Sequence, residues 1–211
     1  MTKAPLIAAL AGLISTAPII LPPTVPPFGI VTVTASPGSL STMWHGLRLD
    51  MLIDDEMVLA CRSNPSCASP AALRFIAIVD EAMTFQGRAL VGHINRAVNS
   101  DIATTRHDVP WLSPLAAMVV PGDCKSYAVT KYAALGEAGI APADRKLVII
   151  YDPAHPKETH LIVVVWVDWQ WLILDDETLT LVDSTSKPTY EPLHTLDENG
   201  VRDFPAIGAT S

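Results

Sequence analysis

Cys124 stands where a loop ending in Gly122-Asp123 meets a predicted helix. A thiol attacks a carbonyl group only as a thiolate, and the backbone N–H groups and dipole at the start of a helix stabilise that anion. Apolar residues follow Cys124 at helical spacing, and Gly139 ends the helix. The pattern predicts a nucleophilic cysteine. An isolated cysteine on a helix is otherwise most often a small core residue.

A nucleophilic cysteine needs a base within hydrogen-bond reach and a third group that orients the base. His160 stands at the start of a predicted buried strand, and Asp175 stands near the end of the next strand. A short turn at residues 168–170 would form a hairpin that places His160 and Asp175 side by side. The carboxylate would hold one imidazole nitrogen and direct the other at Cys124. The order predicts a Cys-His-Asp triad.

Other residues compete for two of these roles. His155 is a rival base, but it lies in a proline-rich loop without a fixed partner. Asp176 is a rival acid. Strand alternation places the side chains of Asp175 and Asp176 on opposite faces, so we expect that only one of them serves. His160 could instead simply end a strand, and Asp175 could be a turn residue.

The elements that must position these residues follow an α+β order, with helices first and strands later. Ser69 as a cap and Pro70 at the first helical position begin one helix. The predicted helices cover residues 69–83, 85–102 and 124–139. The predicted strands cover residues 145–152, 160–167, 171–176 and 178–186, and an Asn-Gly turn follows at 199–200.

The N-terminus differs from the rest of the chain, because no charged residue separates Lys3 from Arg48. We expect a signal peptide or an N-terminal anchor over residues 1–35. Prolines interrupt the apolar run before it reaches the roughly 20 residues of a membrane span, which favours a signal peptide. Its preferred cleavage site is Val33-Thr34-Ala35, ahead of Ser15-Thr16-Ala17. The chain is then periplasmic or secreted; the alternative is a protein anchored by an uncleaved N-terminus.

The remaining domain boundaries follow from composition and cysteine spacing. Residues 36–57 are predicted as a linker, 58–205 as the catalytic domain and 206–211 as a tail. Cys61 and Cys67 flank a Ser-Asn-Pro turn, and this spacing can close a disulfide loop in an oxidising compartment. The gap is too long for an ordinary zinc half-site. The alternative is three reduced cysteines.

Composition excludes some classes of partner. Hydrophobic residues make up 49% of the chain, enough for a buried core, and the formal net charge is −8. The phosphates of a nucleic acid would be repelled by such a surface. No basic run would hold an anionic membrane surface.

Three motifs together resemble one family. The segments GDCKSYAVTKYAALGEAGI, HLIVVVWVDWQWLILDD and HINRAVNSDI resemble the bacterial transglutaminase-like cysteine proteinases over about residues 58 to 205. This family includes periplasmic proteases that cleave biofilm adhesins. The resemblance implies a papain-like, transglutaminase-core fold, with N-terminal helices packed on an antiparallel β-sheet. It also implies Cys124 as nucleophile, His160 as base and Asp175 as orienting acid.

The chain departs from the family pattern beside the cysteine. The family usually has Gly-Asp-Cys-Glu-Asp-Tyr, and here Lys125 and Ser126 replace the two acids. In the adhesin-cleaving branch those acids and the preceding Asp are associated with calcium. Only Asp123 remains, and calcium requires six to eight oxygen ligands. We therefore expect no metal and no cofactor. The family's usual Leu-Asp-Asn is Leu-Asp-Asp here, with Asp176 in the last place.

These observations predict an exported cysteine hydrolase, a peptidase that acts on a protein or peptide. Cys124 would attack the carbonyl carbon, His160 would pass the proton to the leaving amine, and the Cys124 N–H would stabilise the oxyanion. A membrane-associated regulator is a further candidate partner. One alternative is acyl transfer to an amine by the same triad. Another is a non-catalytic periplasmic binding or adaptor module, which Lys125 and Ser126 favour.

Overall fold

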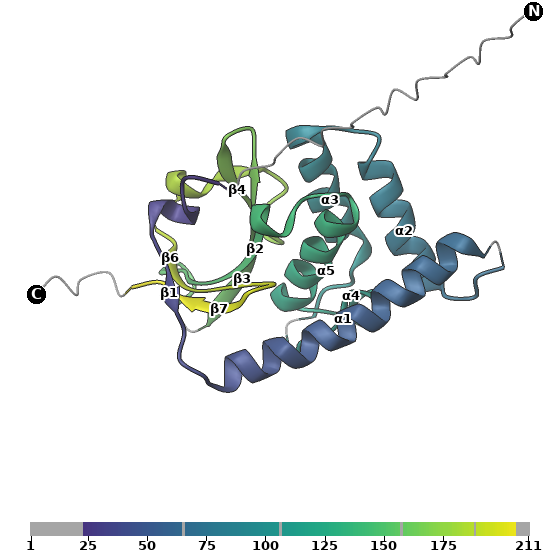
Figure 1. The fold of residues 1–211 in the computed structure, drawn as a ribbon, viewed down its shortest axis with the longest axis horizontal. Helices are drawn as coiled ribbons and strands as arrows, with labels where there is room; N and C mark the ends of the chain where they lie inside the picture. Colours follow the sequence, from purple (N-terminus) through teal and green to yellow (C-terminus); the bar gives the residue numbers. More distant parts are fainter. Residues whose placement is uncertain (1–22, 65, 106, 157, 188, 206–211) are drawn as a thin grey trace, which may run out of the picture.

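The computed structural model describes residues 23–205, apart from residues 65, 106, 157 and 188. Within this part of the chain, helices lie on one side of a seven-stranded antiparallel sheet (Figure 1). The strand order is β1-β7-β6-β2-β3-β4-β5. The helices precede all but the first short strand along the chain. The predicted α+β class, with N-terminal helices on an antiparallel sheet, is confirmed.

The elements are bounded as follows. The helices are α1 (Ser39–Ser63), α2 (Pro70–Ala82), α3 (Gly87–Asp101), α4 (Pro114–Ala117) and α5 (Cys124–Glu137), with short 3-10 turns η1 (Pro27–Gly29), η2 (Pro142–Asp144) and η3 (Ser184–Ser186). The strands are β1 (Val33–Thr34), β2 (Arg145–Tyr151), β3 (Thr159–Val167), β4 (Gln170–Leu174), β5 (Val182–Asp183), β6 (Glu191–Asp197) and β7 (Gly200–Asp203).

Helix α5 is the central helix of the molecule. It packs against β2 and β3 on one side and against α3 on the other. Its residues from Ser126 to Leu135 are all buried, so it is enclosed by other elements rather than exposed along one face. Gly139 follows it with a φ of +90°, a left-handed conformation that glycine adopts without strain. The predicted helix therefore forms, and its first turn presents Cys124 at the sheet.

Strands β3 and β4 form the predicted hairpin, but in a different register. Asp168 and Trp169 make a two-residue turn, both with positive φ, and Val163 pairs with Leu174. This turn is centred one residue later than a direct pairing of His160 with Asp175 requires. The side-by-side pairing was therefore wrong by two residues. The His160 and Asp175 side chains still meet, because Asp175 directly follows the last residue of β4 and turns toward His160.

The N-terminal segment covers the face of the sheet that points away from the helices. The Trp171 indole N–H donates to the Val25 carbonyl at 2.7 Å. The Phe28 ring packs edge-on against the Phe204 ring, with their centroids 6.1 Å apart. Strand β3 is consequently buried on both faces, as its continuous apolar sequence predicts.

The structure places residues 25–35 within the fold, although they were expected to belong to a signal peptide or anchor. Val33 of β1 pairs with Asp203 of β7, and the Ala35 N–H donates to the Val201 carbonyl at 3.3 Å. The preferred cleavage site therefore lies in a paired strand. Residues 1–22 of the expected export segment, and all of the expected tail 206–211, lie outside the described residues.

Residues 36–57 were predicted as a linker, and the structure differs there too. Helix α1 begins at Ser39 and crosses the face of the molecule (Figure 1). Trp44 and Leu47 are buried in the core, and the Trp44 indole N–H donates to the Asp197 carbonyl at 2.9 Å. The segment before the helix is rich in proline and serine, and this composition led to the prediction of a linker instead of a helix that packs on the core. Among the described helices, none combines the length and the apolar character needed to cross a membrane.

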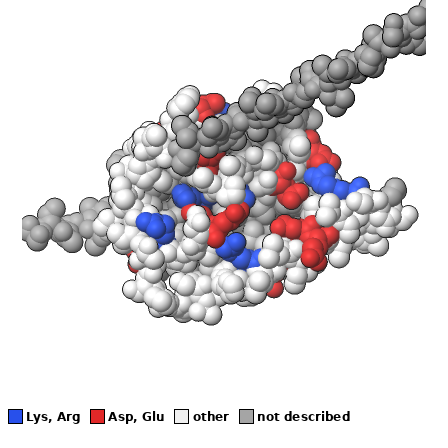
Figure 2. Space-filling model, viewed as in Figure 1, with Lys and Arg blue, Asp and Glu red and all other residues white. Residues whose placement is uncertain are grey.

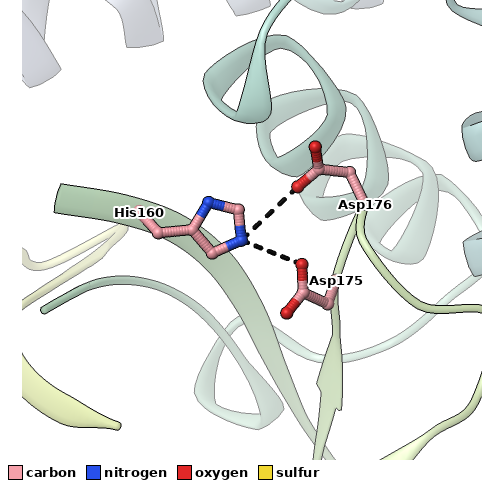
Figure 3. A group of neighbouring side chains, drawn as sticks. All are labelled: His160, Asp175 and Asp176. Atoms are coloured by element: carbon pink, nitrogen blue, oxygen red, sulfur yellow. Dashed lines mark hydrogen bonds and ion pairs between the residues drawn. The ribbon is translucent and has the colours of Figure 1, made fainter. Parts of the chain in front are cut away.

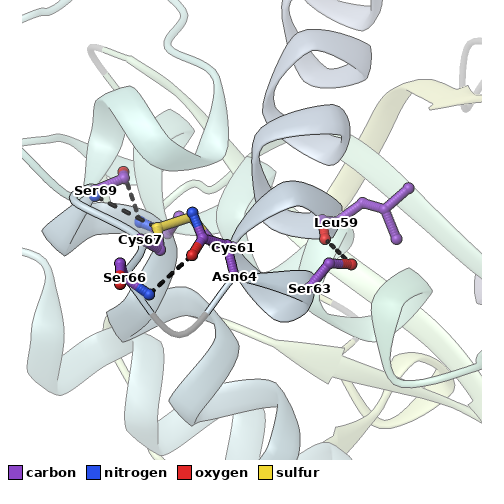
Figure 4. Close-up of a disulfide and its surroundings, with 8 residues drawn as sticks. Leu59, Cys61, Ser63, Asn64, Ser66, Cys67 and Ser69 are labelled. Carbon is purple, nitrogen blue, oxygen red and sulfur yellow. Dashed lines mark hydrogen bonds between the residues drawn. A yellow bond between two sulfur atoms is a disulfide. The ribbon is translucent and has the colours of Figure 1, made fainter.

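A disulfide joins Cys61, near the end of α1, to Cys67, just before α2 (Figure 4). Within the loop, the Ser66 N–H donates to Asn64 Oδ1 at 2.9 Å and the Cys67 N–H donates to the Asn64 carbonyl at 3.0 Å. The pairing leaves Cys124 as the free cysteine of the described residues.

Candidate active site

Cys124 is the first residue of α5 and is partly exposed. Asp123 caps the helix, because its Oδ1 accepts the Lys125 N–H at 3.0 Å. Gly122 lets the preceding loop approach the helix closely, since a Cβ atom at that position would collide with the Ser126 side chain. The Gly-Asp-Cys sequence thus fixes the loop and the helix start around an accessible thiol.

His160 and Asp175 form a hydrogen-bonded pair beside this helix. His160 Nε2 lies 2.8 Å from Asp175 Oδ1 (Figure 3). The Asp175 side chain is 1% exposed and the His160 side chain 15% exposed. Asp175 is itself held in place, because Oδ1 accepts the Glu177 N–H at 3.1 Å and Oδ2 accepts the Tyr190 hydroxyl at 3.0 Å. The imidazole orientation is therefore set by a fixed carboxylate.

Asp176 lies on the same side of the imidazole as Asp175, not on the opposite face as strand alternation predicted. Its Oδ1 is 3.5 Å from His160 Nε2 (Figure 3). The prediction was wrong because β4 ends at Leu174, so the two-residue periodicity of a strand does not extend to residues 175 and 176. Two carboxylates thus approach one imidazole nitrogen.

The charges of this cluster shift the pKa values of its members. Burial opposes the protonation of His160, but hydrogen bonds to Asp175 and Cys124 and the charges of Asp175 and Asp176 outweigh it and raise its pKa to about 11. Burial opposes the ionisation of Asp175, but the hydrogen bond and charge of His160 lower its pKa to about 2. The pair is therefore an imidazolium–carboxylate pair at neutral pH.

The structure brings Cys124, His160 and Asp175 together. The Cys124 side chain contributes to the pKa of His160 as a hydrogen-bond partner, and the carboxylates occupy the Nε2 side of the ring, which leaves Nδ1 for the thiol. His155, the rival base, pairs with Asp152 instead and is 63% exposed. The geometry thus favours His160 over His155.

Sequence reasoning missed two residues that fix the acid. Tyr190 donates to Asp175 Oδ2, and the Asn99 amide on α3 donates to the Asp175 carbonyl at 3.0 Å. Neither stands next to a catalytic motif, so only the packing of distant segments reveals them. The position of Asn99 in the HINRAVNSDI segment was the one available signal.

The position beside the cysteine does not fit a calcium ion. The Lys125 ammonium lies 2.6 Å from Asp108 Oδ1 and 2.5 Å from Asp123 Oδ2. A fixed positive charge therefore bonds both carboxylates where the resemblance implies a calcium-associated acid. His160, Asp175 and Asp176 also offer ligand atoms within 4.8 Å of one another, but the His160–Asp175 hydrogen bond already uses two of those atoms.

A separate pocket lies between α1 and the second half of α5. Its volume is about 230 Å³, and it is lined by charged residues that include Arg48, Asp55, Arg145 and Glu198. Figure 2 shows acidic and basic side chains mixed together on this face of the molecule. Cys124 and His160 do not line the pocket, so it is distinct from the candidate active site.

Helices packed on an antiparallel sheet, with a thiol at the start of the central helix and a buried His-carboxylate pair on the adjacent strands, are typical of papain-like cysteine hydrolases. The family model of the bacterial transglutaminase-like cysteine proteinases matches residues 61–202. The chain belongs to this family and is a cysteine peptidase.

Two solved structures share the fold. LapG of Legionella pneumophila in its calcium-bound form is 16% identical, with a TM-score of 0.58, and the match covers 71% of this chain and 87% of that one. The EGTA-treated form of the same protein is 16% identical, with a TM-score of 0.59, covering 72% of this chain and 86% of the other. None of the curated proteins compared with this chain matches it. At this identity the structures support the fold alone.

Proposed function

We propose that this peptidase is exported and cleaves a protein substrate through Cys124, His160 and Asp175. The observation that carries the proposal is the 2.8 Å bond between His160 Nε2 and a 1% exposed Asp175, on the hairpin that packs against the start of α5. Membership of a protease family implies the protein substrate.

The proposed reaction follows from these positions. The imidazolium of His160 stabilises a thiolate at Cys124, which attacks the carbonyl carbon of the scissile bond. The Cys124 N–H has no acceptor within its own helix because it belongs to the first turn, and it is free to bind the oxyanion. His160 then gives its proton to the leaving amine. The neutral imidazole next takes a proton from water, which hydrolyses the thioester, and Asp175 holds Nε2–H throughout.

Two features support export. The Cys61–Cys67 disulfide is typical of a protein in an oxidising compartment. The apolar N-terminus with prolines resembles a secretory signal. Because residues 25–35 complete the sheet, we place the end of the removed segment before Val25. The mature protein would then be periplasmic or secreted.

The test compares surface proteins of cells that contain wild-type protein with those of cells that contain Cys124→Ala. We expect new protein N-termini only with the wild type. An identical set of N-termini in both cultures would contradict the proposal. Adding a labelled amine separates hydrolysis from acyl transfer. Incorporation of the label into the same substrates would show that the enzyme transfers the acyl group to an amine rather than to water.

A further inference from the structure

Lys131 is a buried charged residue that the proposed reaction does not use. It lies on α5, two helical turns after Cys124 and on the same face, and it is 1% exposed. Its ammonium lies 5.9 Å from the centroid of the Tyr127 ring. Burial lowers its pKa to about 8, and the charges of Asp176 and then Asp175 oppose this shift. A buried ammonium is costly unless a compensating charge lies close by.

Asp176 is the matching unexplained group. Its Oδ1 is buried and has no hydrogen-bond partner among the described residues, although it lies 3.5 Å from His160 Nε2. Burial, together with the charge of Asp175, raises the pKa of Asp176 above its ordinary value, and the charges of His160 and Lys131 oppose this shift. Asp176 therefore faces two cations and one other carboxylate.

Four charged side chains lie in this part of the core, and their charges sum to zero only when Lys131 is included with His160, Asp175 and Asp176. His160 and Asp175 form one hydrogen-bonded pair of opposite charge. A second carboxylate beside the same imidazole would add an uncompensated negative charge, which would oppose thiolate formation at Cys124. Lys131 supplies the charge that removes this excess.

We propose that Asp176 is a second positioning residue for the His160 imidazole and that the buried Lys131 ammonium is its counter-charge. Asp176 approaches the same nitrogen as Asp175 and restricts rotation of the ring from there, and the charge of Lys131 offsets the second negative charge. The inference rests on the proposed catalytic role of His160.

The first test is a thermal-stability cycle of four proteins: wild type, Lys131→Met, Asp176→Asn and the double variant. Methionine keeps the length of the lysine side chain, and asparagine keeps the shape of the aspartate. We expect each single variant to lower Tm, by roughly 5 °C, because it leaves one buried charge without its partner. Lys131→Met should raise Tm when it is introduced into Asp176→Asn, because it then removes the stranded ammonium.

A structural role alone would not shift a titration, so the second test is the rate of Cys124 alkylation by iodoacetamide against pH. The titratable and charged groups that act on His160 are Cys124 of α5, Asp152 after β2, and Asp175 and Asp176 after β4. Lys131 of α5 and Tyr190 before β6 act on these carboxylates. Removing the negative charge of Asp176 favours loss of a proton from both the thiol and the imidazolium. Asp176→Asn should therefore move the inflections of the profile to lower pH, by about 1 unit.

The possible outcomes distinguish the positioning role of Asp176 from the proposed catalytic triad. If Lys131→Met lowers Tm equally in both backgrounds, or if the Asp176→Asn profile overlies that of the wild type, the positioning role is wrong. If wild-type alkylation rises only with the pKa of a free thiol, the catalytic triad itself is wrong. Should Lys131→Met fail to fold, the double variant and Asp176→Asn still decide the question.

Discussion

In the proposed reaction His160 is the central residue, because its imidazole interacts with the Cys124 thiol and with two carboxylates. Nε2 is 2.8 Å from Asp175 and 3.5 Å from Asp176. The carboxylate of Asp175 accepts a backbone N–H and a tyrosine hydroxyl as well, so it cannot turn away from the ring. Such fixed neighbours lower the reorganisation that proton transfer requires.

This pairing should make stability depend on pH. The folded pKa of His160 is raised from 6.5 to about 11, so its contribution is complete below pH 6.5 and is lost as the pH rises toward 11. The folded pKa of Asp175 is lowered from 3.8 to about 2, so its contribution is present above pH 3.8 and is lost as the pH falls toward 2. We expect His160→Gln to lower the free energy of unfolding most between these two limits, pH 3.8 and 6.5.

Urea unfolding at a series of pH values measures this difference. The matched control is His155→Gln, which removes an exposed histidine outside the site. It should change the free energy of unfolding little at any pH. A His160→Gln effect that stayed constant from pH 4 to pH 10 would contradict the proposed ion pair.

Because of Lys125, we expect that removing calcium with a chelator changes neither the stability nor the activity of the protein. The Lys125 ammonium already bonds Asp108 and Asp123, so no divalent cation is needed to hold these carboxylates together. Excess EGTA should leave Tm and peptidase activity as they are, whereas Lys125→Met should lower Tm. A clear fall in the wild-type Tm on adding EGTA would mean that other carboxylates build a calcium site.

At the scale of elements, the N-terminal segment is part of the sheet rather than an appendage. Strand β1 pairs with β7, and residues 25–30 cover the face of the sheet opposite the helices. A chain that begins at Pro23 should melt like the full-length protein. A chain that begins at Ser36 should melt at least several degrees lower, because it exposes apolar surface and loses β1. Circular dichroism melts compare the two chains, and equal melting temperatures would contradict this account.

The sequence predicted the elements that have strong local signals. Helix α2 has a serine cap and a proline at its first position, α5 follows a Pro-Gly-Asp loop, and β3 is apolar from Leu161 to Val167. Helix α1 was missed because its buried residues form only two pairs, Trp44 with Leu47 and Val58 with Cys61, and because it follows a segment rich in proline and serine.

The candidate site was predictable in composition but not in detail. Cys124, His160 and Asp175 could be selected from helix and strand patterns. The exact contacts depend on where β4 ends and on where the hairpin turns, and periodicity does not determine either. Asp176 and Lys131 lie far apart in the sequence, and only the packing of α5 against β3 places their segments in the same part of the core, which local sequence does not encode.

At the scale of the whole molecule, the candidate site is assembled from two parts of the core. Helix α5 supplies the thiol, and the β3–β4 hairpin supplies the imidazole and the carboxylates. The packing of α5 against β3 sets their separation, so the site exists only in the folded chain.

The most direct test of the central claim is the rate at which iodoacetamide alkylates Cys124 at pH 6 in the wild type and in His160→Ala. A free thiol with a pKa of about 8.5 is almost entirely protonated at this pH, so we predict a wild-type rate on the order of 100-fold higher than that of a free thiol. His160→Ala removes the cation that stabilises the thiolate and should bring the rate close to that of a free thiol. Equal rates in the two proteins would contradict a Cys124–His160 catalytic pair.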